Sequence, residues 1–201
     1  MVEKNNQSIV VDPGSDSFDL IIPTNAQAIL FTHEHDDHAS VELTQKIIDS
    51  NPQVALVGTK GTMDKFSHMP KTIIDATTEL PVGDFMITAY FGEHDLVHSD
   101  LSRVENVGYY IDSTVFYGGD TIATIPAQTP KILAVPIASN WAKFSDVIDY
   151  VRKIKPTYAV PVHDRLLSDT GRKVADRHME NLTKNYGITY MRPVGAIEID
   201  E

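Results

Sequence analysis

The chain has 201 residues, of which 42 per cent are hydrophobic and 22 per cent are charged, as is typical of a folded globular protein. Its 17 Lys and Arg residues against 28 Asp and Glu residues give a formal net charge of −11. This charge argues against nucleic acid and anionic membranes as partners, because both would repel the protein. No apolar stretch approaches the roughly 20 residues that span a membrane, so we expect a cytoplasmic protein.

The chain contains no cysteine, so any bound metal must be held by His, Asp and Glu. We expect a single domain over residues 1–201, because no internal repeat and no linker divides the sequence. Residues 8–11 predict a short buried strand that ends in the turn Asp12-Pro13-Gly14, since Pro and Gly interrupt regular structure. Residues 28–31, Ala-Ile-Leu-Phe, predict a second buried strand.

The segment after this strand, residues 32–38, has the sequence Thr-His-Glu-His-Asp-Asp-His. Imidazole nitrogens and carboxylate oxygens suit Zn²⁺ and other first-row divalent ions. Where the chain leaves the strand, His33 and His35 can point to one side, and Asp37 and His38 can face a second point. One loop can therefore serve two adjacent metal ions. The competing interpretation is a polar loop ahead of a helix, with its histidines on the surface.

The pattern His33-x-His35-x-Asp37-His38 resembles the HxHxDH signature of the metallo-β-lactamase superfamily of hydrolases. That resemblance implies an α/β fold, the four-layer αββα sandwich, in which two mixed β-sheets pack face to face with helices outside both. Periodicity alone leaves other α/β arrangements open. Members usually have one or two more strands before the Asp-Pro-Gly turn. We therefore expect a first sheet that is short at its edge, or one that a partner subunit covers in a homo-oligomer.

The remaining elements follow from hydrophobic periodicity and from the positions of Pro and Gly. In chain order we predict a helix at 41–50, a strand at 54–57, a loop with a short helix at 58–69, a strand at 86–91, a hairpin of strands 106–111 and 114–117, a strand at 131–137, a helix at 144–154, a strand at 157–162, a helix at 171–186, and closing strands at 188–191 and 196–199.

Three further metal ligands come from strand ends. The strand at 86–91 leads to His94, which repeats the layout of the first motif and is the predicted third ligand of the first metal. Two glycines precede Asp120 and let the backbone bend closely past a ligand. The Gly-Asp-Thr sequence there matches the superfamily pattern, which implies that Asp120 bridges the two ions. His163 follows the strand at 157–162 and is the predicted third protein ligand of the second metal.

Four other side chains have less defined roles. His98 is a candidate catalytic acid that faces the substrate, a group that orients a ligand by a hydrogen bond, or a loop cap. The single tryptophan, Trp141, forms a wall of the substrate pocket or completes the core. His68 and His178 are expected on the surface, since no ligand cluster surrounds them in the sequence.

Assembled, the first metal would be held by His33, His35 and His94, and Asp120 would be shared. The second would be held by Asp37, His38 and His163. The expected cofactors are two divalent ions, Zn²⁺ in the first place, although Mn²⁺ and Fe²⁺ accept the same ligands. Such a pair can hold a bridging hydroxide that attacks the substrate, and Asp37 is the predicted catalytic residue that orients it.

The expected function is hydrolysis of a small ester, lactone or phosphoester, with an anionic substrate favoured by the net positive centre. Three features resemble the small bacterial hydrolases related to L-ascorbate-6-phosphate lactonase. They are the short chain, the sequence Gly92-Glu93-His94 and the sequence Asn106-Val107-Gly108. The alternatives are a phosphodiesterase or nuclease of the same superfamily, and a non-catalytic metal-binding protein that keeps the fold. The acidic composition argues against a nuclease.

Overall fold

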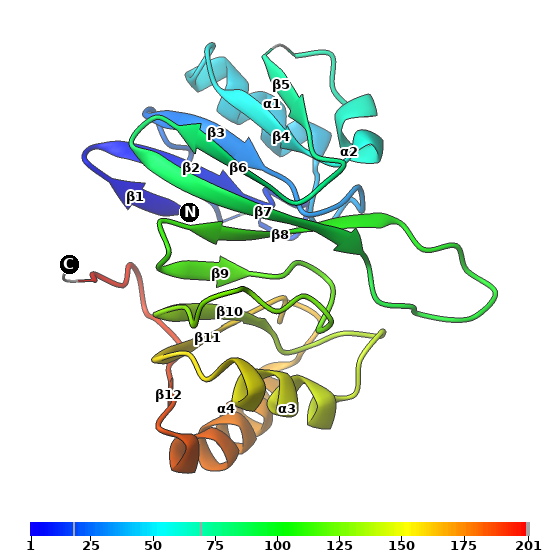
Figure 1. Ribbon diagram of the computed structural model, residues 1–201, viewed down its shortest axis with the longest axis vertical. Coiled ribbons are helices and arrows are strands. Elements are labelled where there is room, and N and C mark those ends of the chain that lie inside the picture. Colours follow the sequence, from blue (N-terminus) through cyan, green and yellow to red (C-terminus); the bar gives the residue numbers. More distant parts are fainter. Residues whose placement is uncertain (18, 69, 200–201) are drawn as a thin grey trace.

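The computed structural model describes residues 1–17, 19–68 and 70–199 of the protein. Within these residues, two β-sheets pack face to face between two layers of helices (Figure 1). Helices α1 (Val41–Ser50) and α2 (Lys60–Asp64) lie on one side, at the top of the view, and helices α3 (Phe144–Ile154) and α4 (Asp169–Thr183) lie on the other. The predicted αββα sandwich with two mixed sheets is thus confirmed.

The first sheet has the order β1-β2-β3-β4-β5 among the described residues. Strand β1 pairs antiparallel with β2, and the other neighbours pair in parallel. The bounds are β1 Val2–Lys4, β2 Gln7–Val11, β3 Ala26–Leu30, β4 Ala55–Gly58 and β5 Lys71–Ile73.

The second sheet has the order β12-β11-β10-β9-β8-β7-β6. Strands β9 to β12 pair in parallel, whereas β6, β7, β8 and β9 pair antiparallel in succession. The bounds are β6 Thr78–Val82, β7 Phe85–Glu93, β8 Glu105–Ile111, β9 Val115–Tyr117, β10 Ile132–Pro136, β11 Tyr158–Val162 and β12 Thr189–Tyr190.

This topology places the carboxyl ends of the ligand-bearing strands at one edge of the sandwich. Strand β3 is parallel to β2 and β4 in the first sheet, and β9, β10 and β11 are parallel in the second. Strand β7 runs in the same direction as β9, because β8 pairs antiparallel with both. The loops that follow β3, β7, β9 and β11 therefore meet at the same edge.

The two sheets are joined next to this edge by buried groups. Tyr109 of β8 is fully buried, and its hydroxyl donates a 2.8 Å hydrogen bond to the carbonyl of Phe31, which follows β3. The backbone N–H of Val107 donates to the Thr32 carbonyl at 2.8 Å. Around them, apolar residues of both sheets form one core that includes Ile9, Leu30 and Ile87. The start of residues 32–38 is consequently fixed by the second sheet.

The helices begin and end where local chemistry predicts. The side chain of Ser40 accepts a hydrogen bond from the backbone N–H of Leu43 and caps α1. Helix α3 ends at Lys155, whose φ of 56° takes the chain out of the helix. A 3₁₀ turn at Lys184–Tyr186 follows α4. None of the helices in the described ranges is both long and apolar enough to cross a membrane.

The structure corrects the prediction in three places. The first sheet, expected to be short at its edge, has one more strand, because Val2–Lys4 form β1 and pair with β2. Strands β5 and β6 were not predicted: both lie at sheet edges and are largely exposed, so they lack the alternation of a half-buried strand. The predicted closing strand at 196–199 is wrong, because those residues form no strand in the described part of the chain. The predicted single domain over residues 1–201 includes positions 18, 69, 200 and 201, which lie outside the described residues.

Candidate metal centre

The structure brings all seven predicted ligands together at the common edge of the two sheets. They form three overlapping groups, in each of which one ligand atom per residue lies within 4.8 Å of the others. The groups are His33, His35 and His94; His33, His38 and Asp120; and Asp37, His38 and His163.

Asp120 stands between the two predicted ligand sets. Its Oδ2 lies 3.4 Å from the Nε2 atoms of both His94 and His163, and its Oδ1 lies 3.3 Å from Nε2 of His38. Asp37 completes the second set, since its Oδ2 lies 3.5 Å from Nε2 of His163. Asp120 therefore has the position that the sequence predicted for a bridging carboxylate.

Several of the converging atoms have no partner in the protein, although they are buried. Among the described residues, Nε2 of His38, Nε2 of His163 and Oδ1 of Asp120 lack a hydrogen-bond partner. Leaving a buried polar atom unpaired costs about 1–3 kcal/mol, so folded proteins rarely tolerate it without a ligand or water. Three such atoms that face one another, all of metal-ligand type, fit a pair of bound divalent ions.

The Nδ1 atoms of His94 and His163 already form hydrogen bonds with backbone carbonyls. Nδ1 of His94 donates to the Asp95 carbonyl, and Nδ1 of His163 donates to the Ala138 carbonyl, both at 2.5 Å. These bonds fix the tautomer and leave Nε2 free to bind a metal. His163 has a φ of 56°, and its hydrogen bond to Ala138 holds the ring despite this backbone conformation.

Asp12 fixes the start of residues 32–38 through hydrogen bonds to its carboxylate. Its carboxylate accepts 2.7 Å hydrogen bonds from the Thr32 backbone N–H, from the Thr32 hydroxyl and from Nδ1 of His38. The Thr32 hydroxyl in turn lies 2.9 Å from Nδ1 of His33. One carboxylate at the end of β2 thereby orients two ligands that follow β3.

Glycines allow the loops to approach this closely. A Cβ atom on Gly14 would lie 1.6 Å from the carbonyl oxygen of Asp37, so no other residue fits there without moving the motif. Gly119 has a φ of 72°, and a Cβ atom on it would lie 2.3 Å from Oδ1 of Asn106. Both positions require glycine, one for close contact and the other also for conformation.

Asp120 is held by two further side chains. Oδ1 of Asn106 accepts the Asp120 backbone N–H at 3.2 Å, and Nε1 of Trp141 donates to Oδ2 of Asp120 at 2.9 Å. The indole therefore contacts the metal centre directly, instead of only completing the core.

Lys65 follows α2 and fixes the outer side of the motif loop. It donates hydrogen bonds to Asp36 and to the carbonyls of Glu34 and Ala39.

Burial and neighbouring charges raise the pKa of some ligand-type side chains in the cluster and lower the pKa of others. Burial lowers the pKa of His33 to about 2, helped by the charge of His38. Burial also lowers the pKa of His38, but the Asp12 and Asp120 carboxylates outweigh it and raise this pKa to about 10. The neighbouring imidazole of His163 lowers the pKa of Asp37 to about 2. Burial raises the pKa of Asp120, but the adjacent imidazoles of His38 and His94 outweigh it and bring this pKa far below its ordinary value.

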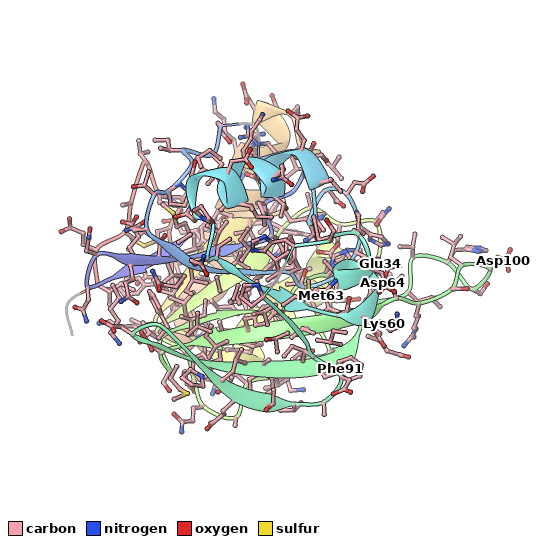
Figure 2. The ribbon with its side chains drawn as sticks, turned by 90° about the horizontal axis from the view of Figure 1, so that it is seen from above. Glu34, Lys60, Met63, Asp64, Phe91 and Asp100 are labelled. Atoms are coloured by element: carbon pink, nitrogen blue, oxygen red, sulfur yellow. The ribbon has the colours of Figure 1, made fainter. Side chains whose placement is uncertain are left out.

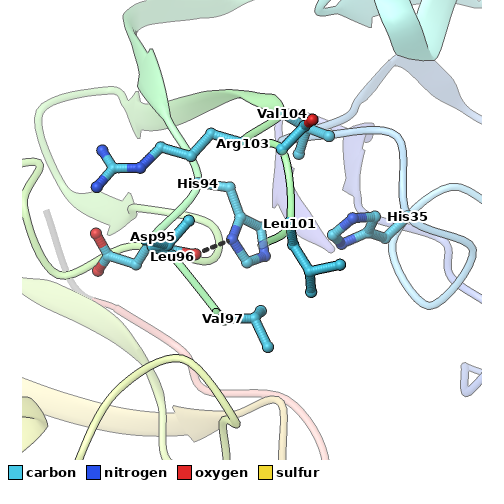
Figure 3. Close-up of a pocket in the computed structure, with 9 residues that line it drawn as sticks. His35, His94, Asp95, Leu96, Val97, Leu101, Arg103 and Val104 are labelled. Atoms are coloured by element: carbon cyan, nitrogen blue, oxygen red, sulfur yellow. Dashed lines mark hydrogen bonds between the residues drawn. The ribbon is translucent and has the colours of Figure 1, made fainter. Parts of the chain in front are cut away.

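The centre opens to solvent on one side. His33, His38, His94 and Asp120 are buried, whereas 42 per cent of the Asp37 side chain is exposed and His35 is also exposed. A cavity of about 190 Å³ adjoins His35 and His94, and its other walls come from residues 95–97 and 101–104 (Figure 3). A substrate can therefore reach the ligands through a recess whose walls include Leu96, Val97 and Leu101.

His98 lies away from the cluster. It belongs to the long loop that projects from the sandwich, with Asp100 at its tip (Figure 2). The His98 side chain is 64 per cent exposed, and its Nδ1 accepts the Asp100 backbone N–H at 3.1 Å. Among its described contacts none is with a predicted metal ligand. The structure thus gives His98 the loop-cap geometry and provides no support for the predicted catalytic role.

The other two histidines lie outside the cluster, and His178 is on the surface as predicted, whereas His68 is half-buried. Nε2 of His68 is within 2.9 Å of the Val54 carbonyl, and His178 is on the exposed face of α4. Sequence reasoning missed the supporting roles of Asp12 and Asn106. The available signal was the position of Asp12 at the end of a strand parallel to β3.

The fold and the site together define a metallo-β-lactamase-type protein with a His and Asp cluster able to bind metal. Residues 1–163 match the model of the Beta-lactamase superfamily domain, so the chain belongs to this family.

Three known proteins to which the chain is similar give further comparisons. Protein Rv0786c of Mycobacterium tuberculosis (strain ATCC 25618 / H37Rv) is 27% identical over 188 residues, which cover 91% of this chain and 88% of that protein. A Parabacteroides distasonis structure, assigned provisionally as a metal-dependent hydrolase, is similar with a TM-score of 0.72 and 19% identity, over 94% of this chain and 85% of that one. CmlA, a diiron beta-hydroxylase from Streptomyces venezuelae, is similar with a TM-score of 0.62 and 15% identity, over 93% of this chain and 49% of that one. The two structures show the shared fold, and the reaction must be argued from the site.

Proposed function

We propose that the protein is a metal-dependent hydrolase of a small ester, lactone or phosphoester. The observation that supports this proposal is the set of buried, unpartnered ligand atoms beside an open, solvent-facing side. A closed structural site would surround its metal with protein on all sides, whereas a catalytic site keeps a position for water or substrate.

Two divalent ions fit the ligand set. His33, His35 and His94 would hold one, and Asp37, His38 and His163 would hold the other, with Asp120 between them. We propose Zn²⁺ as the physiological ion, because five imidazoles and no thiolate suit it well, with Mn²⁺ and Fe²⁺ as alternatives. When bound, such ions polarise a carbonyl or phosphoryl oxygen and lower the pKa of water to about 7.

The chain itself supplies orientation at this site. Asp37 remains ionised at neutral pH, because the neighbouring His163 imidazole holds its pKa at about 2. Its partly exposed carboxylate can accept a hydrogen bond from the attacking water and so direct it toward the substrate. Trp141 and Asp12 keep Asp120 and His38 in place, so the ligands need little rearrangement during turnover.

The charge of the centre favours an anionic substrate. The ligand set carries two carboxylates, Asp37 and Asp120, so two divalent ions would leave it positive. The protein as a whole is acidic, with a formal net charge of −11, which disfavours long polyanions such as RNA. A small phosphorylated molecule or a lactone therefore suits the site better than a nucleic acid.

The test begins with the metal content of protein purified without chelator. We expect about two ions per chain, and hydrolysis of a chromogenic phosphodiester, ester or lactone that is lost with chelator and restored by Zn²⁺ or Mn²⁺. His33→Ala should abolish turnover, whereas the control His68→Gln, outside the cluster, should retain it. Metal binding without turnover of any substrate class would favour the non-catalytic alternative, and cleavage of RNA with strong salt dependence would favour the nuclease.

A further inference from the structure

A second cavity, larger than the first, lies between α3 and α4. It has a volume of about 530 Å³, within the range of small-molecule sites. The β10–α3 connection forms one wall, and residues 166–171 with α4 form the other. The side chains that line its floor are mainly apolar and include Ile137, Ala142, Phe144, Val147, Leu167 and Ala175.

This groove lies next to the metal centre, because the same backbone segments contribute to both. Ala138 lines the groove, and its carbonyl accepts the hydrogen bond that orients His163. Trp141, which donates to Asp120, lies between the groove residues Asn140 and Ala142. Leu166 and Leu167 follow His163 by three and four residues. The groove therefore begins beside the second ligand set.

The rim of the groove exposes apolar side chains that contribute little to the core. Leu166 is 72 per cent exposed and Val174 is 41 per cent exposed, and both line the groove. Single exposed apolar residues are common, but here they border a recess whose floor is also apolar. Polar side chains also line the groove, so one end of a ligand can stay solvated; they are Ser139, Asn140, Thr170 and His178.

We propose that this groove binds a hydrocarbon chain of the substrate, so that the hydrolysed group carries an acyl or alkyl arm of several carbons. The inference rests on the proposed hydrolase function and specifies its substrate class. The metal centre requires a polar reacting group, whereas the groove offers a mainly apolar surface to the rest of the molecule. Burial of each methylene should raise kcat/KM about fourfold until the chain fills the groove.

The test uses the zinc-loaded protein and a series of p-nitrophenyl esters from acetyl to decanoyl. We expect kcat/KM to rise with chain length in the wild-type protein. Val174→Glu should reduce the decanoyl-to-acetyl ratio at least tenfold, because a carboxylate at the rim opposes the chain. Leu182→Glu is the matched control, since Leu182 is on the same helix, is also 41 per cent exposed and does not line the groove.

A binding measurement separates this inference from the proposed function. Calorimetry of decanoate with the wild-type protein should show binding that Val174→Glu weakens and Leu182→Glu does not. If no ester, lactone or phosphodiester is hydrolysed but decanoate binding follows this pattern, the hydrolase proposal fails and the groove remains an apolar binding site. Equal chain-length ratios or equal decanoate affinities in the two variants would overturn the assignment of the groove.

Discussion

Replacing Gly14 by alanine tests whether the contact between the first turn and the motif loop determines metal binding. The new Cβ atom would lie 1.6 Å from the Asp37 carbonyl oxygen, 2.0 Å from its carbonyl carbon and 2.7 Å from the His38 nitrogen. Real Cβ atoms essentially never approach other heavy atoms within 3.0 Å. The Asp37–His38 peptide must therefore move by more than an ångström, or the turn at Gly14 must move instead.

Such a displacement is large compared with the tolerance of a metal or catalytic site, which is about 0.5 Å. Asp37 and His38 are two of the ligands proposed for the second ion, so we expect its affinity to fall at least 100-fold, equivalent to about 2.8 kcal/mol. Overpacking should also reduce the free energy of unfolding by about 1–3 kcal/mol. Turnover at saturating substrate should fall with the loss of the second ion.

The assay is a competition titration of the metal-free protein with Zn²⁺ and a chromogenic chelator, paired with circular dichroism and thermal unfolding. Gly92→Ala is the control, because Gly92 lies two residues from His94, yet the nearest atom to an added Cβ is 3.9 Å away. A folded Gly14→Ala protein that binds two ions with wild-type affinity would refute the argument from close contact. Loss of metal in Gly92→Ala would show that any change near the ligands has this effect.

Four further predictions follow from the same geometry. Apparent Zn²⁺ affinity should rise with pH between about 6.5 and 10, because the ion must displace a proton from His38, whose pKa is raised to about 10. The metal-free protein should lose stability over that same range, since the unfolded chain releases this proton first, and chelator-treated protein unfolded in urea at several pH values measures the loss. In the metal-free Asp12→Asn variant the His38 pKa should fall well below 10, which NMR titration would reveal, because burial then opposes fewer negative charges. Asp37→Ala should lower kcat strongly and change the free energy of unfolding little. An unchanged kcat in a fully metallated variant would contradict the orienting role of Asp37.

The αββα sandwich was predicted through the resemblance to the superfamily, whereas most of the cluster was predicted from local patterns in the sequence. Four ligands lie within residues 33–38, so their proximity needs no long-range information. His94 and His163 were found because each follows an apolar strand, and parallel strands deliver such residues to one edge. Asp120 was found by its glycine-rich turn and by resemblance to the superfamily.

The missing parts depend on contacts between distant segments. The hydrogen bond from Trp141 to Asp120 spans two loops, and no spacing rule predicts it. The choice among the predicted roles of His98 could not be made from the sequence, because no periodicity encodes the direction in which its loop leaves the sandwich. Strand β6 contains Pro81 and lies at an edge, where pairing on one side suffices and the usual strand pattern is weak.

The distribution of the ligands along the chain also sets the order of events during synthesis. His33, His35, Asp37 and His38 leave the ribosome together, but on a flexible nascent chain they form only an open chelating peptide. His163 is made 125 residues after His38, and both sheets must pack before it can face Asp37. The complete centre can therefore form only after residue 163 has been made and both sheets have packed, and an ion held by all of its ligands stabilises that folded state. Full metal occupancy is thus a readout of whether the chain has been made as far as His163 and has folded.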